Sequence, residues 1–243
     1  MTNIIDLDRR HVWHPYTQHQ TERDPVEVTH GDGAVLFDAE GQKIVDMISS
    51  WWTCIHGHAH PEINRALSEQ ASRVAHVMFS GFTHRPGVEL AAKLAEVLPG
   101  DLNKVFFSDD GSTAVEVALK MAYQYWANQG DLQRKTFLAF DGGYHGDTFG
   151  SMAVGKASGF FTLFEDLMCS VISTPYVGTW LDDKEIEDRE NWALGELETL
   201  LTDNDGQIAG IIMEPLMQGA SGMNFSRPRF VNRVAELARK ANT

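Results

Sequence analysis

Two acids, a glycine and two hydroxyl residues stand in a row in the segment FFSDDGSTAVEVALKMA, residues 106–122. The row follows an apolar stretch and precedes a pattern typical of a helix. A side chain among residues 108–110 could simply cap that helix by accepting hydrogen bonds from the free amides of its first turn. Alternatively, Gly111, Ser112 and Thr113 could present backbone N–H groups and hydroxyls at the positive end of the helix, where phosphate binds. The segment alone leaves both interpretations open.

A second candidate for chemistry is the segment FDGGYHGDTFG, residues 140–150. Tyr144 lies in a glycine-rich turn after a predicted strand, so its ring can approach a ligand with little steric obstruction. A planar aromatic ring can stack on a flat cofactor, although a tyrosine packed beneath a loop is the alternative. Phosphate donors after one strand and an exposed aromatic ring after the next suit a phosphorylated heteroaromatic ring. Pyridoxal phosphate meets that description.

Three histidines alternate along the chain, which raises the question of a metal site. Alternation in an extended segment places the imidazoles of His56, His58 and His60 on one face. No carboxylate or thiolate stands at a matching spacing. We therefore expect a tight turn built around Gly57 and Pro61, and no metal.

Two adjacent tryptophans, Trp51 and Trp52, precede these histidines. We expect the segment to be extended, so that the two side chains point to opposite faces. One of them can then line a pocket while the other packs.

The composition indicates an acidic globular protein. The 243 residues carry a formal charge of −14, which argues against the broad basic face that nucleic acid or an anionic membrane requires. Cys54 and Cys169 form no CxxC pair, so we expect neither a disulfide framework nor a thiolate zinc site. The start MTNIIDLDRR lacks the pattern of a signal peptide, and no apolar run is long enough for a transmembrane helix. We expect a soluble cytoplasmic protein that binds neither nucleic acid nor membrane.

Hydrophobic periodicity predicts the elements that position these residues. Alternation on both sides of residues 39–41 indicates a β-hairpin. Strands that alternate with helices indicate an α/β fold with a mostly parallel sheet covered on both faces. In such a sheet, residues 110–113 lie beyond the carboxyl end of a strand, where ligands bind. The predicted helices cover residues 61–76, 86–97, 112–128 and 228–241, and the predicted strands cover residues 104–107, 136–140 and 208–214.

Two further patterns concern packing. The helix that begins near residue 112 carries an apolar stripe formed by Val115, Ala118, Leu119, Ala122, Tyr123 and Trp126. The run LDDKEIEDRE, residues 181–190, is densely charged, and we interpret it as a solvated loop without function.

Six segments of the chain, from about Arg9 to its end, resemble the class III pyridoxal-phosphate aminotransferases and, within them, the diaminopelargonate synthases of biotin synthesis. GHAHP and YHG are typical of the whole class, whereas WHPYT and SSWW are the more specific signals. In chain order the segments are RHVWHPYTQ, SSWWTCIHGHAHP, HVMFSGFTHRPGVELAAKL, DGSTAVEVALKMA, GGYHGDTFGSMAV and IIMEPLMQGASGM.

The resemblance implies a fold-type I pyridoxal-phosphate transferase that forms a homodimer with active sites at the subunit interface. Gly111 and Ser112 match the positions that bind the cofactor phosphate, and Tyr144 matches a residue that lines the cofactor and substrate site. Trp51 matches a substrate-site tryptophan. Tyr16 matches the tyrosine that recognises the keto-acid substrate and stacks on the adenine of the amino donor.

The resemblance also implies a domain organisation. Residues 1–60 match an N-terminal segment that contributes to a small domain and to the active site. Residues 61–243 match the cofactor-binding large domain, which we expect to be incomplete at its C-terminal end.

Two departures from the family pattern stand out. Relatives often have a neutral residue where this chain has Asp110, and a carboxylate so close to the phosphate would repel it unless it points away.

The lysine that forms the Schiff base and the aspartate that holds the pyridinium nitrogen lie, in this family, beyond a helix like the last one here. Lys156 is the lysine nearest to the Tyr144 segment, but nothing places it at the cofactor carbon. We therefore expect the sequence to be the N-terminal part of the enzyme, inactive alone.

The resemblance implies transfer of the amino group of S-adenosylmethionine to 7-keto-8-aminopelargonate. Two alternatives remain. One is another class III ω-aminotransferase that acts on a diamine or an ω-amino acid, against which Tyr16 and Trp51 argue. The other is a non-catalytic fragment that binds a phosphorylated ligand or pairs with a full-length subunit.

Overall fold

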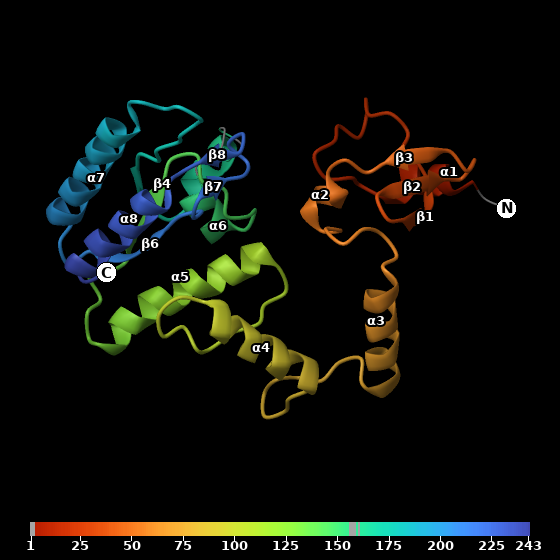
Figure 1. Ribbon diagram of the computed structural model, residues 1–243, viewed down its shortest axis with the longest axis horizontal. Helices are drawn as coiled ribbons and strands as arrows, with labels where there is room; N and C mark the ends of the chain where they lie inside the picture. The colour runs from red at the N-terminus through yellow and green to blue at the C-terminus, as the bar shows by residue number, and fades with distance from the viewer. Residues whose placement is uncertain (1–2, 156–158, 160) are drawn as a thin grey trace. The chain divides into compact units, whose positions relative to one another are not determined.

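A computed structural model describes residues 3–155, 159 and 161–243. The chain divides into two compact units, Met1–Asn103 and Lys104–Thr243 (Figure 1). The organisation expected from the resemblance, with a division after residue 60, remains a prediction. Within the described residues, no helix is both long and apolar enough to cross a bilayer.

The first unit is built around a small antiparallel sheet in the order β1–β2–β3. The predicted hairpin is confirmed, because β2 and β3 pair with Leu36 opposite Ile44. Strand β1 was not expected from the sequence, and it pairs with β2 on the other side. The elements of this unit are α1 (Ile4–His11), β1 (Val28–Asp32), β2 (Val35–Asp38), β3 (Lys43–Val45), α2 (Ser49–Trp52), α3 (Pro61–Arg73) and α4 (Arg85–Val97).

The SSWW segment is a left-handed turn, so the predicted extended conformation is wrong. Positive φ angles run from Ser49 (φ 49°) through Ser50 (48°) and Trp51 (59°) to Trp52 (63°). L-residues other than glycine pay about 1–2 kcal/mol each for this region, because Cβ approaches the following carbonyl oxygen. Four such residues in succession require support from the surrounding structure.

The predicted parallel sheet is present in the second unit, and its strands lie in the order β5–β4–β6, which the sequence did not predict. Leu138 on the central strand β4 lies opposite Ile172 on one side and Ile211 on the other. Antiparallel strands β7 and β8 form a separate small ribbon. The elements of this unit are α5 (Gly111–Asn128), β4 (Thr136–Phe140), α6 (Phe149–Val154), the 3₁₀ helix η1 (Thr162–Leu167), β5 (Val171–Thr174), α7 (Ile186–Asp203), β6 (Ile208–Ile212), β7 (Met217–Gln218), β8 (Asn224–Phe225) and α8 (Pro228–Lys240).

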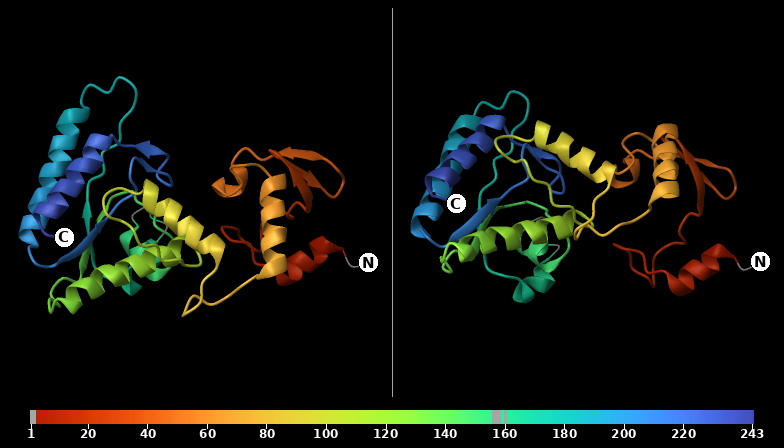
Figure 2. Two further views of the ribbon diagram at one scale, coloured as in Figure 1. Left: turned by 60° about the horizontal axis from the view of Figure 1, so that its bottom comes forward. Right: turned by 90° about the horizontal axis from the view of Figure 1, so that it is seen from below.

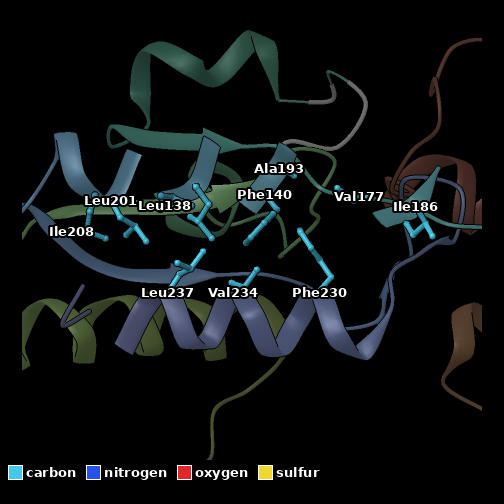
Figure 3. Close-up of a cluster of buried hydrophobic side chains, with 11 residues drawn as sticks. Leu138, Phe140, Val177, Ile186, Ala193, Leu201, Ile208, Phe230, Val234 and Leu237 are labelled. Atoms are coloured by element: carbon cyan, nitrogen blue, oxygen red, sulfur yellow. The ribbon is translucent and has the colours of Figure 1, made fainter. Parts of the chain in front are cut away.

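Helices cover both faces of this parallel sheet (Figure 2). Leu138 and Phe140 of β4 pack with α7 and α8 on one face, where Phe230 of α8 lies edge-to-face against Phe140 (Figure 3). Phe137 and Ala139 point to the other face and pack with α5. The alternation along β4 therefore anchors α5, and with it the residues at its N-terminus.

The predicted stripe of α5 is confirmed over most of its length. The cluster on that face of the sheet includes Val115, Leu119, Ala122 and Trp126. Trp126 also donates a hydrogen bond from Nε1 to a backbone carbonyl of β6, at 2.9 Å. Tyr123 lies on the exposed side of the helix, with 42% of its surface accessible.

The strand predicted over residues 104–107 is wrong for this chain. The segment has no regular structure, and among the described residues it forms no strand pair. Phe106 and Phe107 are 65% and 40% exposed. A strand needs a neighbour to satisfy its backbone groups, and an apolar pattern cannot by itself supply one.

The charged run is not a solvated loop throughout, so that interpretation is wrong. Residues from Ile186 onward form the first turn of α7, and Ile186 itself is buried. Glu190 is only 2% exposed and accepts two hydrogen bonds from Arg227, which precedes α8. Asp183 is also buried and pairs with Arg189. Three of the eight charged residues in the run therefore form buried or half-buried ion pairs rather than face water.

Candidate active site

Asp110 is the N-cap of α5, so the capping interpretation of the opening segment is confirmed. Its Oδ1 accepts a hydrogen bond from the amide of Thr113 at 2.8 Å. In return, the Thr113 hydroxyl oxygen accepts one from the amide of Asp110 at 3.0 Å, which completes a capping box. The cap uses both polar groups of Thr113.

The cap does not use the first two amides of the helix. Within the described part of the chain, no acceptor bonds the amides of Gly111 and Ser112. A Cβ built on Gly111 would meet no atom within 4 Å, so open space lies beside this amide. Two free N–H groups at the positive end of an 18-residue helix, next to open space, fit a phosphate group.

The loop that carries Tyr144 lies directly against this helix start. The Ser112 hydroxyl oxygen accepts a hydrogen bond from the amide of Asp147 at 3.1 Å, and the Ser112 carbonyl accepts one from the Ser151 hydroxyl at 2.9 Å. Gly146 approaches so closely that a Cβ there would stand 2.1 Å from the Ser112 hydroxyl oxygen. The structure thus brings together the helix start and the Tyr144 loop.

Tyr144 is half-buried, and its ring is held from two sides. The hydroxyl donates a hydrogen bond to Oδ2 of Asp147 at 3.0 Å. The ring stacks near Phe161, with centroids 6.3 Å apart and planes at 22°. Tyr144 is therefore a partly fixed aromatic side chain on the loop that is hydrogen-bonded to the start of α5.

Three residues that sequence reasoning did not single out form hydrogen bonds to the backbone of the Tyr144 loop. Glu214 accepts hydrogen bonds from the amide of Tyr144 at 2.8 Å and, with its other oxygen, from the amide of Gly219 at 2.9 Å. Gln218, only 1% exposed, donates to the carbonyl of Asp141 at 2.7 Å. Ser221 donates to the carbonyl of Gly142. The signal for them was the segment EPLMQGAS, residues 214–221, used only to establish the resemblance.

His145 follows Tyr144 and is half-buried in the same loop. Burial lowers the pKa of His145 below 6.5, and the negative charge of Glu214 opposes this shift only in part. Its Nε2 is buried without a hydrogen-bond partner among the described residues. The ring is therefore neutral at neutral pH and contributes no positive charge to the phosphate region.

The other two predicted site residues, Tyr16 and Trp51, lie together in the first unit. Their ring centroids are 5.4 Å apart with the planes at 79°, an edge-to-face contact. Both side chains are exposed, by 71% and 59% respectively. They form a paired aromatic surface of the kind that a flat or apolar ligand can cover.

The alternating histidines have separate environments. Nε2 of His58 lies 2.8 Å from Oδ2 of Asp46. The rings of His56 and His60 instead lie edge-to-face, with their centroids 6.2 Å apart. No group of three candidate ligands suited to a metal ion occurs in the part of the chain that the structure describes. Lys156, the lysine nearest in sequence to Tyr144, lies outside the described residues.

Comparison with known proteins decides the family. Residues 16–243 match the family described as aminotransferase class III. The chain belongs to the class III aminotransferases. The resemblance to pyridoxal-phosphate transaminases of class III and the α/β fold expected from the sequence are confirmed.

Several relatives of this class III chain are similar over almost all of it. It is 48% identical over 233 residues to the adenosylmethionine-8-amino-7-oxononanoate aminotransferase of Synechococcus elongatus. The matched region covers 96% of this chain and 54% of that protein. A crystal structure of the enzyme of the same name from Methanocaldococcus jannaschii is 33% identical, with a TM-score of 0.88 over 99% of this chain and 53% of that chain. The class III chain therefore spans about half the length of the relatives it matches.

A third neighbour shows how widely this fold is shared. The crystal structure of an omega transaminase from Pseudomonas jessenii, in complex with PMP, has a TM-score of 0.89 over 99% of this class III chain and 55% of that chain. At 24% identity, the likeness shows the fold alone.

Proposed function

We propose that this chain is part of an aminotransferase of biotin synthesis that transfers the amino group of S-adenosylmethionine to 7-keto-8-aminopelargonate, giving 7,8-diaminopelargonate. The observation that carries the proposal is the pair of free amides at Gly111 and Ser112, beside open space and joined to the Tyr144 loop. The names of the similar proteins supply the substrate class. The complete enzyme is proposed to act as a homodimer in the cytoplasm.

The residues of the second unit are proposed to hold the cofactor. Gly111 and Ser112 donate their amides to the phosphate, and the helix dipole favours its charge. Tyr144 presents its ring to the cofactor and substrate, with its hydroxyl oriented by Asp147. When bound, pyridoxal phosphate acts as the electron sink for exchanging an amino group with a carbonyl group.

Tyr16 and Trp51 are proposed to bind the substrates. Their edge-to-face pair offers an aromatic surface to the adenine of the amino donor and to the apolar chain of the keto acid.

No lysine of this chain matches the family lysine that bonds the cofactor. We therefore expect residues 1–243 to bind pyridoxal phosphate by its phosphate group without turnover.

A pair of matched glycine variants tests the phosphate site. Gly111 and Gly195 both lie in helices, have no positive φ and leave open space where a Cβ would stand. Gly111→Val fills the space that the phosphate needs, whereas Gly195→Val fills space on α7 away from any predicted site residue. We expect Gly111→Val to weaken pyridoxal phosphate binding at least about tenfold, equivalent to about 1.4 kcal/mol, with Gly195→Val unchanged.

Equilibrium dialysis with pyridoxal phosphate and with inorganic phosphate measures both affinities. Equal affinities for the two variants would place the phosphate elsewhere. Absence of binding to the unmodified chain would refute the cofactor assignment.

Asp110 provides a second test of the same site. Its carboxylate caps α5 beside the amides assigned to the phosphate, so its charge opposes binding. Asn caps a helix as well as Asp does, so Asp110→Asn keeps the helix start while removing the charge. We expect it to tighten phosphate binding several-fold, more than Asp109→Asn, and the difference between the two variants to shrink in high salt.

A second candidate function is that of another class III ω-aminotransferase, because a solved (S)-enantioselective omega-transaminase from Thermomicrobium roseum is 29% identical to this chain, with a TM-score of 0.87. The ligand response of the Tyr16–Trp51 pair distinguishes the two. A response to S-adenosylmethionine supports the biotin-pathway enzyme, whereas a response to a diamine alone supports the alternative. If a complete enzyme containing this chain has no transaminase activity, the remaining reading is a non-catalytic phosphate-binding protein.

A further inference from the structure

The turn that carries Trp51 departs most strongly from ordinary backbone geometry among the described residues. Ser49, Ser50, Trp51 and Trp52 all have positive φ, and Trp51 is held against Tyr16 rather than packed into a core. No residue of helix α2 is buried. Apolar packing therefore does not hold this turn, and polar contacts must do so.

Besides backbone hydrogen bonds such as that from the amide of Trp52 to the carbonyl of Ile48 at 2.8 Å, one carboxylate supplies the side-chain contacts. Oδ1 of Asp46 accepts a hydrogen bond from the amide of Ser50 at 3.0 Å, and Oδ2 accepts one from the Ser50 hydroxyl at 2.8 Å. Oδ2 also lies 2.8 Å from Nε2 of His58. The Asp46 side chain is only 7% exposed, so it is shielded by the turn that it supports.

These hydrogen bonds stabilise the ionised carboxylate. They lower the pKa of Asp46 from 3.8 to about 2, with the Ser50 amide as the largest cause, followed by His58 and the Ser50 hydroxyl. Asp46 is therefore charged at every pH at which the protein is expected to work. A charged acceptor gives stronger hydrogen bonds than a neutral one, which suits it to hold a strained turn.

The contacts of Asp46 and His58 also tie the turn to the hairpin sheet. The amide of His58 donates to the carbonyl of Gly33 at 2.7 Å, and the amide of Gly33 donates back to His58 at 3.2 Å. The amide of Asp46 donates to the carbonyl of Ala34 at 2.9 Å. Asp46 before the turn and His58 after it are thus both hydrogen-bonded to the connection between β1 and β2. The Asp46 carboxylate also joins these two residues to each other.

We propose that Asp46, oriented by His58, is a positioning residue that holds the left-handed turn and thereby sets the Trp51 ring against Tyr16 for substrate. The functional part of this proposal rests on the proposed role of Tyr16 and Trp51 in binding substrate. The positioning itself concerns only residues of the first unit and can be measured without any ligand.

The test uses the full chain labelled with 5-fluorotryptophan. The chain has 6 tryptophans, and the ¹⁹F signal of Trp51 is assigned as the one absent from Trp51→Phe. Asp46→Ala should shift and broaden the Trp51 signal and abolish its response to Tyr16→Leu, because the ring contact is lost. Asp38→Ala is the matched control, since Asp38 also accepts backbone amides in a tight turn of this unit, those of Glu40 and Gln42.

Graded variants keep the test valid if Asp46→Ala unfolds the unit. Ser50→Ala removes one of the three donors and His58→Gln alters another, so each should shift the Trp51 signal less than Asp46→Ala does. Amide NMR signals of the paired strands β2 and β3 report whether the unit remains folded. An unchanged Trp51 signal in Asp46→Ala, or an equal shift in Asp38→Ala, overturns the proposal.

Ligand titration separates this proposal from the proposed function. Addition of S-adenosylmethionine or 7-keto-8-aminopelargonate should move the Trp51 signal of the unmodified chain and should have less effect in Asp46→Ala. If neither ligand moves the signal while Asp46→Ala still displaces the ring, the substrate role of the pair fails and the positioning role stands. If the ligands act equally on both proteins, the positioning role fails.

Discussion

The two units of this chain are stabilised in different ways. All of the buried hydrophobic residues in the described part of the chain lie in the second unit, between Leu119 and Leu237. The first unit has none, and its three tryptophans, Trp13, Trp51 and Trp52, are 82%, 59% and 62% exposed. In the second unit, Trp126 is half-buried and hydrogen-bonded to β6, whereas Trp180 and Trp192 are 64% and 59% exposed, so the contrast lies in the apolar core and not in the tryptophans.

The second unit therefore has an apolar core that fixes its loops, whereas the first unit exposes most of its apolar side chains. The second unit buries apolar side chains on both faces of a parallel sheet, which fixes the start of α5 and the Tyr144 loop. The first unit depends on carboxylates such as Asp38 and Asp46 that accept backbone amides in its turns. Exposed aromatic side chains in such numbers are typical of surfaces that ligands or partners cover.

The largest expected difference between the units concerns phenylalanine truncation. Phe230 is 1% exposed and lies edge-to-face against Phe140 and Tyr176, whereas Phe82 of the first unit is 57% exposed. We expect Phe230→Ala to lower the free energy of unfolding by about 3–5 kcal/mol and Phe82→Ala by about 0.5 kcal/mol or less. Urea unfolding, followed by the amide NMR signals of the paired strands β4–β6 and β2–β3, measures the stability of each unit. Equal losses of stability in the two variants would contradict the difference drawn between the units.

A smaller effect is expected for charges in the second unit. Glu190 is buried and accepts two hydrogen bonds from Arg227, while Glu198 pairs with Lys240 at the surface. Glu190→Gln leaves an amide N–H group facing the guanidinium, so it should destabilise the unit several times more than Glu198→Gln. The same urea assay measures both. Equal effects would restore the interpretation of residues 181–190 as a solvated run.

The smallest expected effect is a difference in pH dependence. Burial lowers the pKa of His145 below 6.5, so the unfolded second unit takes up a proton first and its stability falls as the pH drops below about 6.5. Asp46 has its pKa lowered from 3.8 to about 2, so its contribution to the first unit is present above pH 3.8 and is lost as the pH falls towards 2. His145→Gln should make the stability of the second unit less dependent on pH near 6.5, and Asp46→Asn should do the same for the first unit below pH 3.8.

Urea unfolding at a series of pH values, followed by the amide NMR signals of β4–β6 and of β2–β3, measures the two dependences separately. If both units lost stability over the same pH range, the assignment of the two groups to separate transitions would be wrong.

Sequence alone determined the elements whose signals are local. A proline at the first turn and an amphipathic pattern predicted α3 and α8, and continuous apolar runs predicted β4 and β6. The capping box of α5 is likewise encoded within residues 110–113. For the same reason, the sequence located the predicted phosphate donors, because their geometry follows from where one helix begins.

Tertiary structure alone decided which long-range partners exist. The apolar residues 104–107 read as a strand, yet no described strand pairs with them. Glu190 reads as a surface charge, yet Arg227 lies 37 positions later in the chain and removes it from water. Glu214 reaches the amide of Tyr144 across 70 positions. Hydrogen bonds and burial between residues so far apart in sequence depend on the packing of the whole sheet, which no local pattern encodes.

The SSWW turn shows the same limit at short range. Nothing in the residue types of Ser49–Trp52 favours a left-handed conformation, since glycine, asparagine and aspartate are the usual occupants. In the folded unit, Ser50 of this turn donates hydrogen bonds to Asp46, and Asp46 bonds His58, which the hairpin holds in place. Sequence therefore identified the tryptophan, whereas its backbone geometry depends on contacts that form only when the sheet has folded.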